Sequence, residues 1–169
     1  MRLIYALTIK LPMTRIKPLT FLTSLRLIVF AFACTSVLPA TAQDGPQAKL
    51  AVAELTAGMH VIHAELAVTP EQQAAGMMFR RGMAPNDGML FVNSEAGVRC
   101  FWMRNTLIPL SIAFVDEDGT VVNIADMAPR SDESHCSVKP VRYALEVPLG
   151  WFAKRGFKAG LKLRGGPFR

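Results

Sequence analysis

A short stretch of the chain, CFWMRNT, combines aromatic, polar and charged side chains in a pattern typical of a small binding site. Trp102 offers a flat apolar wall, and Asn105 and Thr106 offer hydrogen-bonding groups at the corner that follows. Arg104, or Arg80 from an earlier turn, adds a fixed positive charge. Such a pocket would suit a small anionic or glycan-like ligand. The alternative is a tight corner in which Asn105 and Thr106 bond their own backbone and Trp102 plugs the end of a sheet.

Sulfur and imidazole groups suggest a second kind of site. Thioethers and imidazoles are soft ligands that suit Cu(I) in an exported protein. Methionine is also a common filler of apolar cores, and the chain has no Met-x-Met or His-x-His run. Copper binding therefore stays an alternative, and the main prediction is no metal and no cofactor. The residues concerned are Met77, Met78, Met83, Met89, Met103, His60, His63 and His135.

Acidic residues give only weak support for catalysis. Asp132, Glu133 and His135 are close in sequence, but they fall in a polar segment that reads as an exposed loop. The chain has no Gly-x-Ser-x-Gly, His-Glu-x-x-His, phosphate-loop or dinucleotide motif. A small periplasmic hydrolase is kept as an alternative. Glu146 is flanked by two apolar residues on an expected strand, and alternation of faces predicts that its side chain is exposed.

The first 42 residues have the anatomy of an export signal. Cationic residues up to Arg26 precede an apolar run over 27–38, and Ala-Thr-Ala precedes an expected cleavage after Ala42. Met13 offers an alternative start that leaves this signal intact. The apolar run of twelve residues falls short of the ~20 needed to span a bilayer, so no stable membrane span is expected after cleavage. We predict a periplasmic or secreted protein.

The basic charge of the whole chain comes from this leader. The chain carries 19 Lys and Arg against 13 Asp and Glu, but five of the basic residues and none of the acidic ones precede residue 43. The remaining chain has 14 basic and 13 acidic residues, a net charge of +1. Nucleic-acid binding needs a basic surface, so we do not expect a nucleic-acid partner.

Two cysteines remain after the leader, Cys100 and Cys136. Two thiols in an oxidising compartment usually pair, so a disulfide between them is predicted. Closing a loop of this length would stabilise the fold by ~3–4 kcal/mol. The alternatives are a free pair, or a Cys100 nucleophile assisted by His135.

Periodicity and turn residues predict a mainly β protein with one or two short helices. Thr69 as N-cap and Pro70 at the first position mark a helix start, and the sequence DEDG between two β-rich runs marks a hairpin. The polar segment 129–140 reads as a loop. The expected elements are strands over 58–69, 89–92, 99–103, 111–115, 120–125, 142–147 and 161–163, and helices over 70–79 and 149–155.

These elements predict a compact, antiparallel, jelly-roll-like sandwich or a partly closed barrel. We divide the chain into a signal peptide over 1–42, a linker and first segment over 43–57, and a single domain over 58–169.

Three blocks of the chain resemble the domain-of-unknown-function 192 family. They are GMMFRRGMAPNDGMLFV (76–92), FWMRNTLIPLSIAFVDEDGTVV (101–122) and YALEVPLGWFAKRGFKAGLKL (143–163). The resemblance implies a small, mainly β, jelly-roll-like domain that is often exported, and it implies no established activity. Two places depart from the family pattern: Ser111 stands where an aspartate is expected, and 160–162 lack the usual aspartate after the glycine.

These observations together predict an exported, non-catalytic module that binds a small ligand or a protein partner of the cell envelope.

Overall fold

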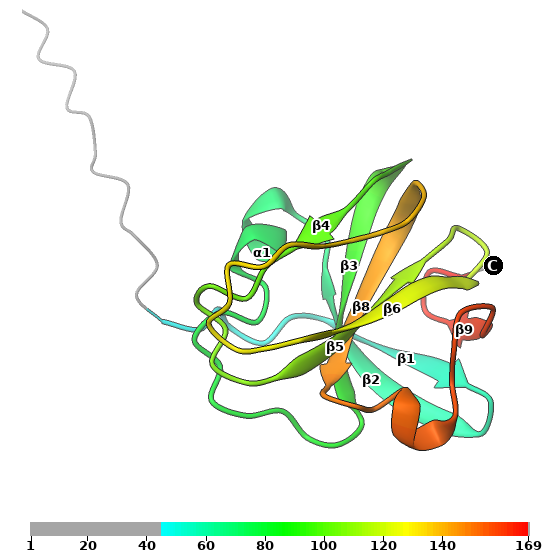
Figure 1. Cartoon of the computed structure of the whole chain (residues 1–169), viewed down its shortest axis with the longest axis horizontal. Coiled ribbons are helices and arrows are strands. Elements are labelled where there is room, and N and C mark those ends of the chain that lie inside the picture. Colours follow the sequence, from blue (N-terminus) through cyan, green and yellow to red (C-terminus); the bar gives the residue numbers. More distant parts are fainter. Residues whose placement is uncertain (1–44, 169) are drawn as a thin grey trace, which may run out of the picture. The chain divides into compact units, whose positions relative to one another are not determined.

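A computed structural model of the chain describes residues 45–168, which form nine strands and two short helices (Figure 1). The expected signal peptide and its cleavage site lie outside the described residues. Seven strands form one sheet in the order β6-β5-β8-β3-β2-β1-β9, and β4 and β7 form a separate pair. The strands are β1 (Val52–Ala57), β2 (His60–Ala67), β3 (Asp87–Gly97), β4 (Cys100–Phe101), β5 (Leu110–Val115), β6 (Val121–Met127), β7 (His135–Cys136), β8 (Val141–Pro148) and β9 (Leu163–Gly165).

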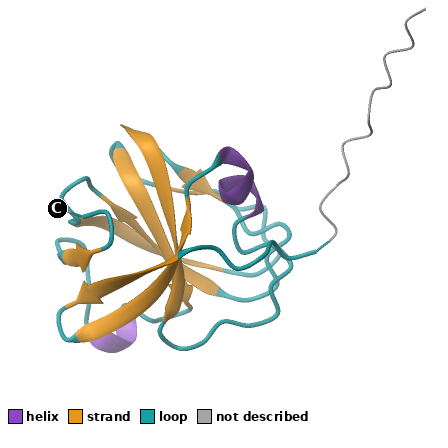
Figure 2. Cartoon of the chain, turned by 180° about the vertical axis from the view of Figure 1, so that it is seen from behind, coloured by secondary structure: helices purple, strands orange, loops and turns teal. Residues whose placement is uncertain are grey.

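The large sheet curls into a half-barrel, as Figure 2 shows from behind. All neighbouring strands run antiparallel except β2 and β3, which are parallel because helix α1 (Pro70–Ala75) lies between them in the chain. The two edges of the sheet approach each other where the N–H of Val121, the first residue of β6, donates to the carbonyl of Leu161, two residues before β9 (2.8 Å). The predicted mainly β fold with few helices, in the form of a partly closed barrel, is confirmed.

The start of helix α1 was predicted correctly and its end was not. The Thr69 hydroxyl accepts a hydrogen bond from the Gln72 N–H, and the Gln72 side chain accepts one from the Thr69 N–H, which forms a capping box. The helix ends at Ala75 instead of Phe79. Gly76 has a φ of 45°, and a Cβ at this position would lie 3.3 Å from the Phe91 ring. The chain therefore turns at Gly76 because β3 lies directly against it.

Several other expected elements are present with shifted bounds. The predicted hairpin is confirmed as β5 and β6. The expected second helix is a turn followed by the short 3-10 helix η1 (Ala153–Arg155), and the last strand is two residues later than predicted. The expected 129–140 loop contains β7, and residues 52–57 form β1 in the large sheet.

Two apolar clusters cover the two faces of the central strands. Leu145 and Val147 of β8 belong to the first cluster, and Ala144 belongs to the second. Because both faces are covered, β5 and β8 consist almost entirely of buried residues. The second cluster faces α1 and the β4–β7 pair, and the candidate site lies there.

Candidate functional site

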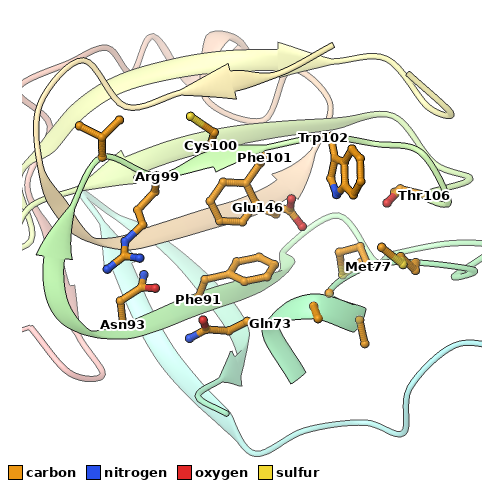
Figure 3. A pocket seen from close by; sticks show the side chains of 15 residues that line it. Gln73, Met77, Phe91, Asn93, Arg99, Cys100, Phe101, Trp102, Thr106 and Glu146 are labelled. Carbon is orange, nitrogen blue, oxygen red and sulfur yellow. The ribbon is translucent and has the colours of Figure 1, made fainter. Parts of the chain in front are cut away.

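A pocket of about 380 Å³ lies beside α1, with β3, β4 and β8 supplying the rest of its wall (Figure 3). Its volume lies in the range of small-molecule sites. The turn after α1 contributes Met77, and the segment after β4 contributes Trp102 and Thr106. The remaining lining residues are Gln73, Ala74, Ala75, Gly76, Met78, Phe91, Asn93, Val98, Arg99, Cys100, Phe101 and Glu146.

Aromatic rings form the apolar wall of this pocket. The Phe91 and Phe101 rings meet edge to face with centroids 4.8 Å apart, and Phe101 also packs against Phe114 at 5.9 Å. Trp102 is 48% exposed, so its ring continues the wall toward solvent. The Arg104 guanidinium lies 4.1 Å from the centre of the Trp102 ring. These rings give a ligand apolar contact on more than one side.

Glu146 places a buried carboxyl group among these apolar side chains. The residue is only 4% exposed, and within the described part of the chain no hydrogen bond reaches its buried Oε2 atom. Its direct strand neighbours are Met89 on β3 and Ile112 on β5. Burial raises the pKa of Glu146 to about 8, because an apolar environment disfavours the charged carboxylate. At neutral pH this carboxyl group is therefore mostly protonated.

The predicted exposure of Glu146 is wrong. Strand alternation correctly places its side chain on the face opposite Leu145 and Val147. That face is not open to solvent, because the β4–β7 pair and the turn after α1 cover it and form the pocket. Glu146 is thus a lining residue that the sequence analysis missed.

Polar groups at the other side of the pocket have unused hydrogen-bonding capacity. The Gln73 amide nitrogen donates to the Val92 carbonyl (2.8 Å), and the Asn93 amide nitrogen donates to the Arg142 carbonyl (2.9 Å). Among the described residues, no group donates to the side-chain oxygen of Gln73 or Asn93. Arg99 donates through Nη2 to a backbone carbonyl (2.7 Å), while its buried Nε atom has no acceptor in residues 45–168.

The structure brings only part of the predicted site together. Trp102 and Thr106 line the pocket. Arg104 stands beside Trp102 and pairs with Asp132 at 2.7 Å. Asn105 does not line the pocket, and its amide nitrogen lies 3.8 Å from the Met78 sulfur.

Arg80, the fifth predicted site residue, lies outside this pocket in a buried ion pair with Glu65. Its Nη1 and Nη2 atoms donate to the two carboxylate oxygens at 2.5 and 2.8 Å. Burial alone would raise the pKa of Glu65, but hydrogen bonds from Arg80 and the Leu50 N–H hold it below its usual value. The same hydrogen bond to Glu65 raises the pKa of Arg80. Both Nη atoms of Arg80 are therefore already hydrogen-bonded to Glu65.

The two cysteines form a disulfide that holds the small sheet together. The Cys100 and Cys136 sulfurs lie 2.07 Å apart, and the residues face each other in the β4–β7 pair. This bonded sulfur leaves no free thiol for a Cys100 nucleophile. His135, the proposed partner of that nucleophile, pairs in register with Phe101. Because Cys100 and Phe101 line the pocket, the disulfide fixes one of its walls.

The methionine and histidine residues considered for copper occupy different surroundings. Met77, Met89 and Met103 are buried in the second apolar cluster, where they fill the core. His60 packs edge-on against Trp151, with ring centroids 6.2 Å apart. Within residues 45–168, no three His, Cys, Asp or Glu side chains are grouped so that they could hold a metal ion.

In the described part of the chain, no helix combines the length and the apolar character needed to span a membrane.

Solved structures of other proteins resemble this fold. The structure of a protein from Sinorhizobium meliloti 1021, described as a "putative transcription regulator", superposes with a TM-score of 0.68 and 35% sequence identity, over 72% of this chain and 99% of that one. The structure of a protein of unknown function from Novosphingobium aromaticivorans DSM 12444 gives a TM-score of 0.67 and 37% identity, over 74% and 94% of the two chains. None of the curated proteins matches the chain.

The DUF192 family, which carries the description "Uncharacterized ACR", matches residues 52–165. This match includes every strand of the large sheet and all residues that line the pocket. The chain therefore belongs to the DUF192 family.

Proposed function

We propose that this protein is an exported, non-catalytic module that binds a small ligand of the cell envelope in the pocket around Glu146. The observation that carries the proposal is a buried carboxyl group with no partner in residues 45–168, set in the wall of a pocket. A buried polar group without a hydrogen bond destabilises the fold. Such a group is explained if a ligand supplies the missing bond.

Two features support export. Residues 1–42 carry the cationic and apolar segments of a signal peptide, and the disulfide between Cys100 and Cys136 suits an oxidising compartment. The Sinorhizobium protein is described as a "putative transcription regulator". We do not propose nucleic-acid binding for this chain, because residues 43–169 carry a net charge of only +1.

Binding can be tested on a fragment of residues 43–169. The Sinorhizobium chain adopts this fold over 99% of its length while matching only 72% of this chain, so the fold forms there without the rest. We would screen a library of small uncharged, cationic and anionic fragments by NMR and map the backbone amide shifts. The proposal expects hits whose shifts cluster on the amides of the pocket residues.

A variant that fills the pocket provides the control. Ala74 lines the pocket and is exposed, so Ala74→Trp should occupy the cavity without disturbing the core. Ala153→Trp places the same side chain on the exposed face of η1, away from the pocket. Hits should be lost in the first variant and kept in the second. Shifts that are scattered over the surface, or that are equal in both variants, would contradict the proposal.

A further inference from the structure

We propose that the pocket recognises uncharged molecules that carry an amide group, and that Glu146 binds this amide as a neutral carboxylic acid. This inference rests on the proposed function, because it names the ligand class of the same pocket. A neutral carboxyl group has an O–H donor beside a carbonyl acceptor. A cis amide, as in a lactam, presents a carbonyl acceptor beside an N–H donor. The two groups can therefore form a pair of parallel hydrogen bonds.

The surroundings of Glu146 argue for the neutral form. On its own face of the sheet its direct neighbours are Met89 and Ile112, and neither carries a charge. The next residue in this row is Glu65 on β2, which faces Met89 and is already paired with Arg80. The segment before β4 contributes Arg99, and α1 and its following turn contribute no charged group to the lining. His135 on β7 pairs in register with Phe101 but does not line the pocket.

None of these charged groups stabilises a Glu146 carboxylate. Burial is the only cause that raises the pKa of Glu146 to about 8, with no contribution from Arg99 or from the Glu65–Arg80 pair. An ionised carboxylate in such an environment would lack both a counter-ion and a hydrogen-bond donor. The pocket at neutral pH therefore presents a carboxylic acid.

Charged ligands fit this arrangement less well. A cationic ligand would require Glu146 to lose its proton, and the one full charge in the lining at neutral pH is the positive guanidinium of Arg99. A ligand carboxylate could accept the Glu146 proton and would suit the charge of Arg99, but it has no donor for the second oxygen of Glu146. An uncharged group with a donor and an acceptor side by side satisfies both oxygens at once.

The rest of the lining is compatible with an amide on an apolar frame. The Phe91 and Phe101 rings provide apolar contact for carbon atoms. The side-chain oxygens of Gln73 and Asn93 receive no hydrogen bond from the described residues, so they can accept further N–H groups of a larger ligand. Thr106 adds a buried hydroxyl to the lining.

Four six-membered ring compounds would test this inference on the 43–169 fragment by NMR titration. 2-Piperidone carries the cis amide, and N-methyl-2-piperidone lacks its N–H. Piperidinium and cyclohexanecarboxylate are the cationic and anionic counterparts. We expect 2-piperidone to bind about tenfold more tightly than each of the other three, since one hydrogen bond in a buried site has about this effect.

The pH profile gives a second readout. The dissociation constant of 2-piperidone should be constant below about pH 7 and should rise about tenfold per pH unit well above 8, because binding needs the protonated carboxyl group. Glu146→Gln keeps an adjacent donor and acceptor, so its binding should no longer weaken at high pH. Glu146→Leu should abolish binding at every pH, and Ala74→Trp should do the same by filling the pocket.

The outcomes separate the two proposals. Preferred binding of piperidinium, with affinity that rises with pH and is lost in Glu146→Gln, would overturn the amide inference and leave the binding pocket standing. Preferred binding of cyclohexanecarboxylate, or equal binding of the N-methylated lactam, would overturn it as well. Absence of binding by all four compounds would overturn the amide inference, and absence of binding by the fragment library as well would overturn both proposals.

Discussion

The ring of Phe91 on β3 meets the ring of Phe101 on β4 edge to face, with centroids 4.8 Å apart. This contact joins the large sheet to the small β4–β7 pair across the pocket wall. The small pair has only two residues in each strand, so its own hydrogen bonds cannot hold it in place. The disulfide and the packing of Phe101 on the core must therefore keep the pocket in shape.

Removal of the disulfide should both destabilise the domain and loosen this wall. The bond between Cys100 and Cys136 closes a loop with a sequence separation of 36. We expect the double replacement of both cysteines by serine to lower the free energy of unfolding by about 3–4 kcal/mol in urea titrations. Amide hydrogen exchange should accelerate most in β4 and β7. Unchanged exchange in these strands would show that the disulfide does not hold the wall.

Trp102 should contribute to binding more than to stability. Its side chain is 48% exposed, and it lines the pocket. Trp102→Ala should change the free energy of unfolding by less than about 1 kcal/mol, as is usual for surface positions, and should weaken the binding of pocket ligands several-fold. Leu149→Ala is the matched control, because Leu149 is 42% exposed and lies outside the pocket lining. Equal loss of binding in both variants would argue against a role of Trp102 in the site.

The two arginine ion pairs should differ in their contribution to stability. The Glu65–Arg80 pair is largely buried, whereas the side chains of Arg104 and Asp132 are 54% and 67% exposed. Arg80→Met leaves a buried carboxylate without its partner, so we expect a loss of about 2–4 kcal/mol in the free energy of unfolding. Arg104→Met should lose no more than about 1 kcal/mol. Chemical denaturation measures both, and similar losses would contradict the assigned burial.

Glu146 should make the stability of the domain depend on pH. Its folded-state pKa of about 8 lies above the ordinary value of 4.5, so the folded state keeps a proton that the unfolded state has already released. The stability that the protonated Glu146 gives to the folded state is fully present below about pH 4.5 and is lost as the pH rises toward 8. The expected loss is on the order of 3–5 kcal/mol.

Comparison with Glu146→Gln isolates this effect from other titrating groups. The difference in unfolding free energy between the wild-type fragment and the variant should move in favour of the variant as the pH is raised from 5 to 8. A constant difference over this range would mean that Glu146 has an ordinary pKa in the folded protein.

Local signals predicted much of the fold. The β-rich runs around DEDG gave the β5–β6 hairpin, and Thr69 and Pro70 marked the start of α1 because capping depends on neighbouring residues. The end of α1 depends on how closely Gly76 approaches the Phe91 ring. That contact joins residues that are 15 positions apart and has no local signature.

The candidate site was predicted less well, for a related reason. Strand alternation indicates on which face Glu146 lies, but only the three-dimensional arrangement shows that the β4–β7 pair covers this face. An acidic residue within an apolar strand was the signal that could have pointed to the site. Arg80 lies outside the pocket because it pairs with Glu65 on β2, and pairing between distant segments cannot be read from spacing.

Amide recognition by the pocket depends most directly on the ionisation state of Glu146. An NMR titration of the fragment labelled with ¹³C at glutamate side-chain carboxyl carbons measures it, with the Glu146 signal assigned through Glu146→Gln. A buried, unpartnered carboxyl group predicts a midpoint near pH 8. A midpoint near 4.5, the ordinary value for glutamate, would contradict the central claim that the pocket presents a neutral carboxylic acid.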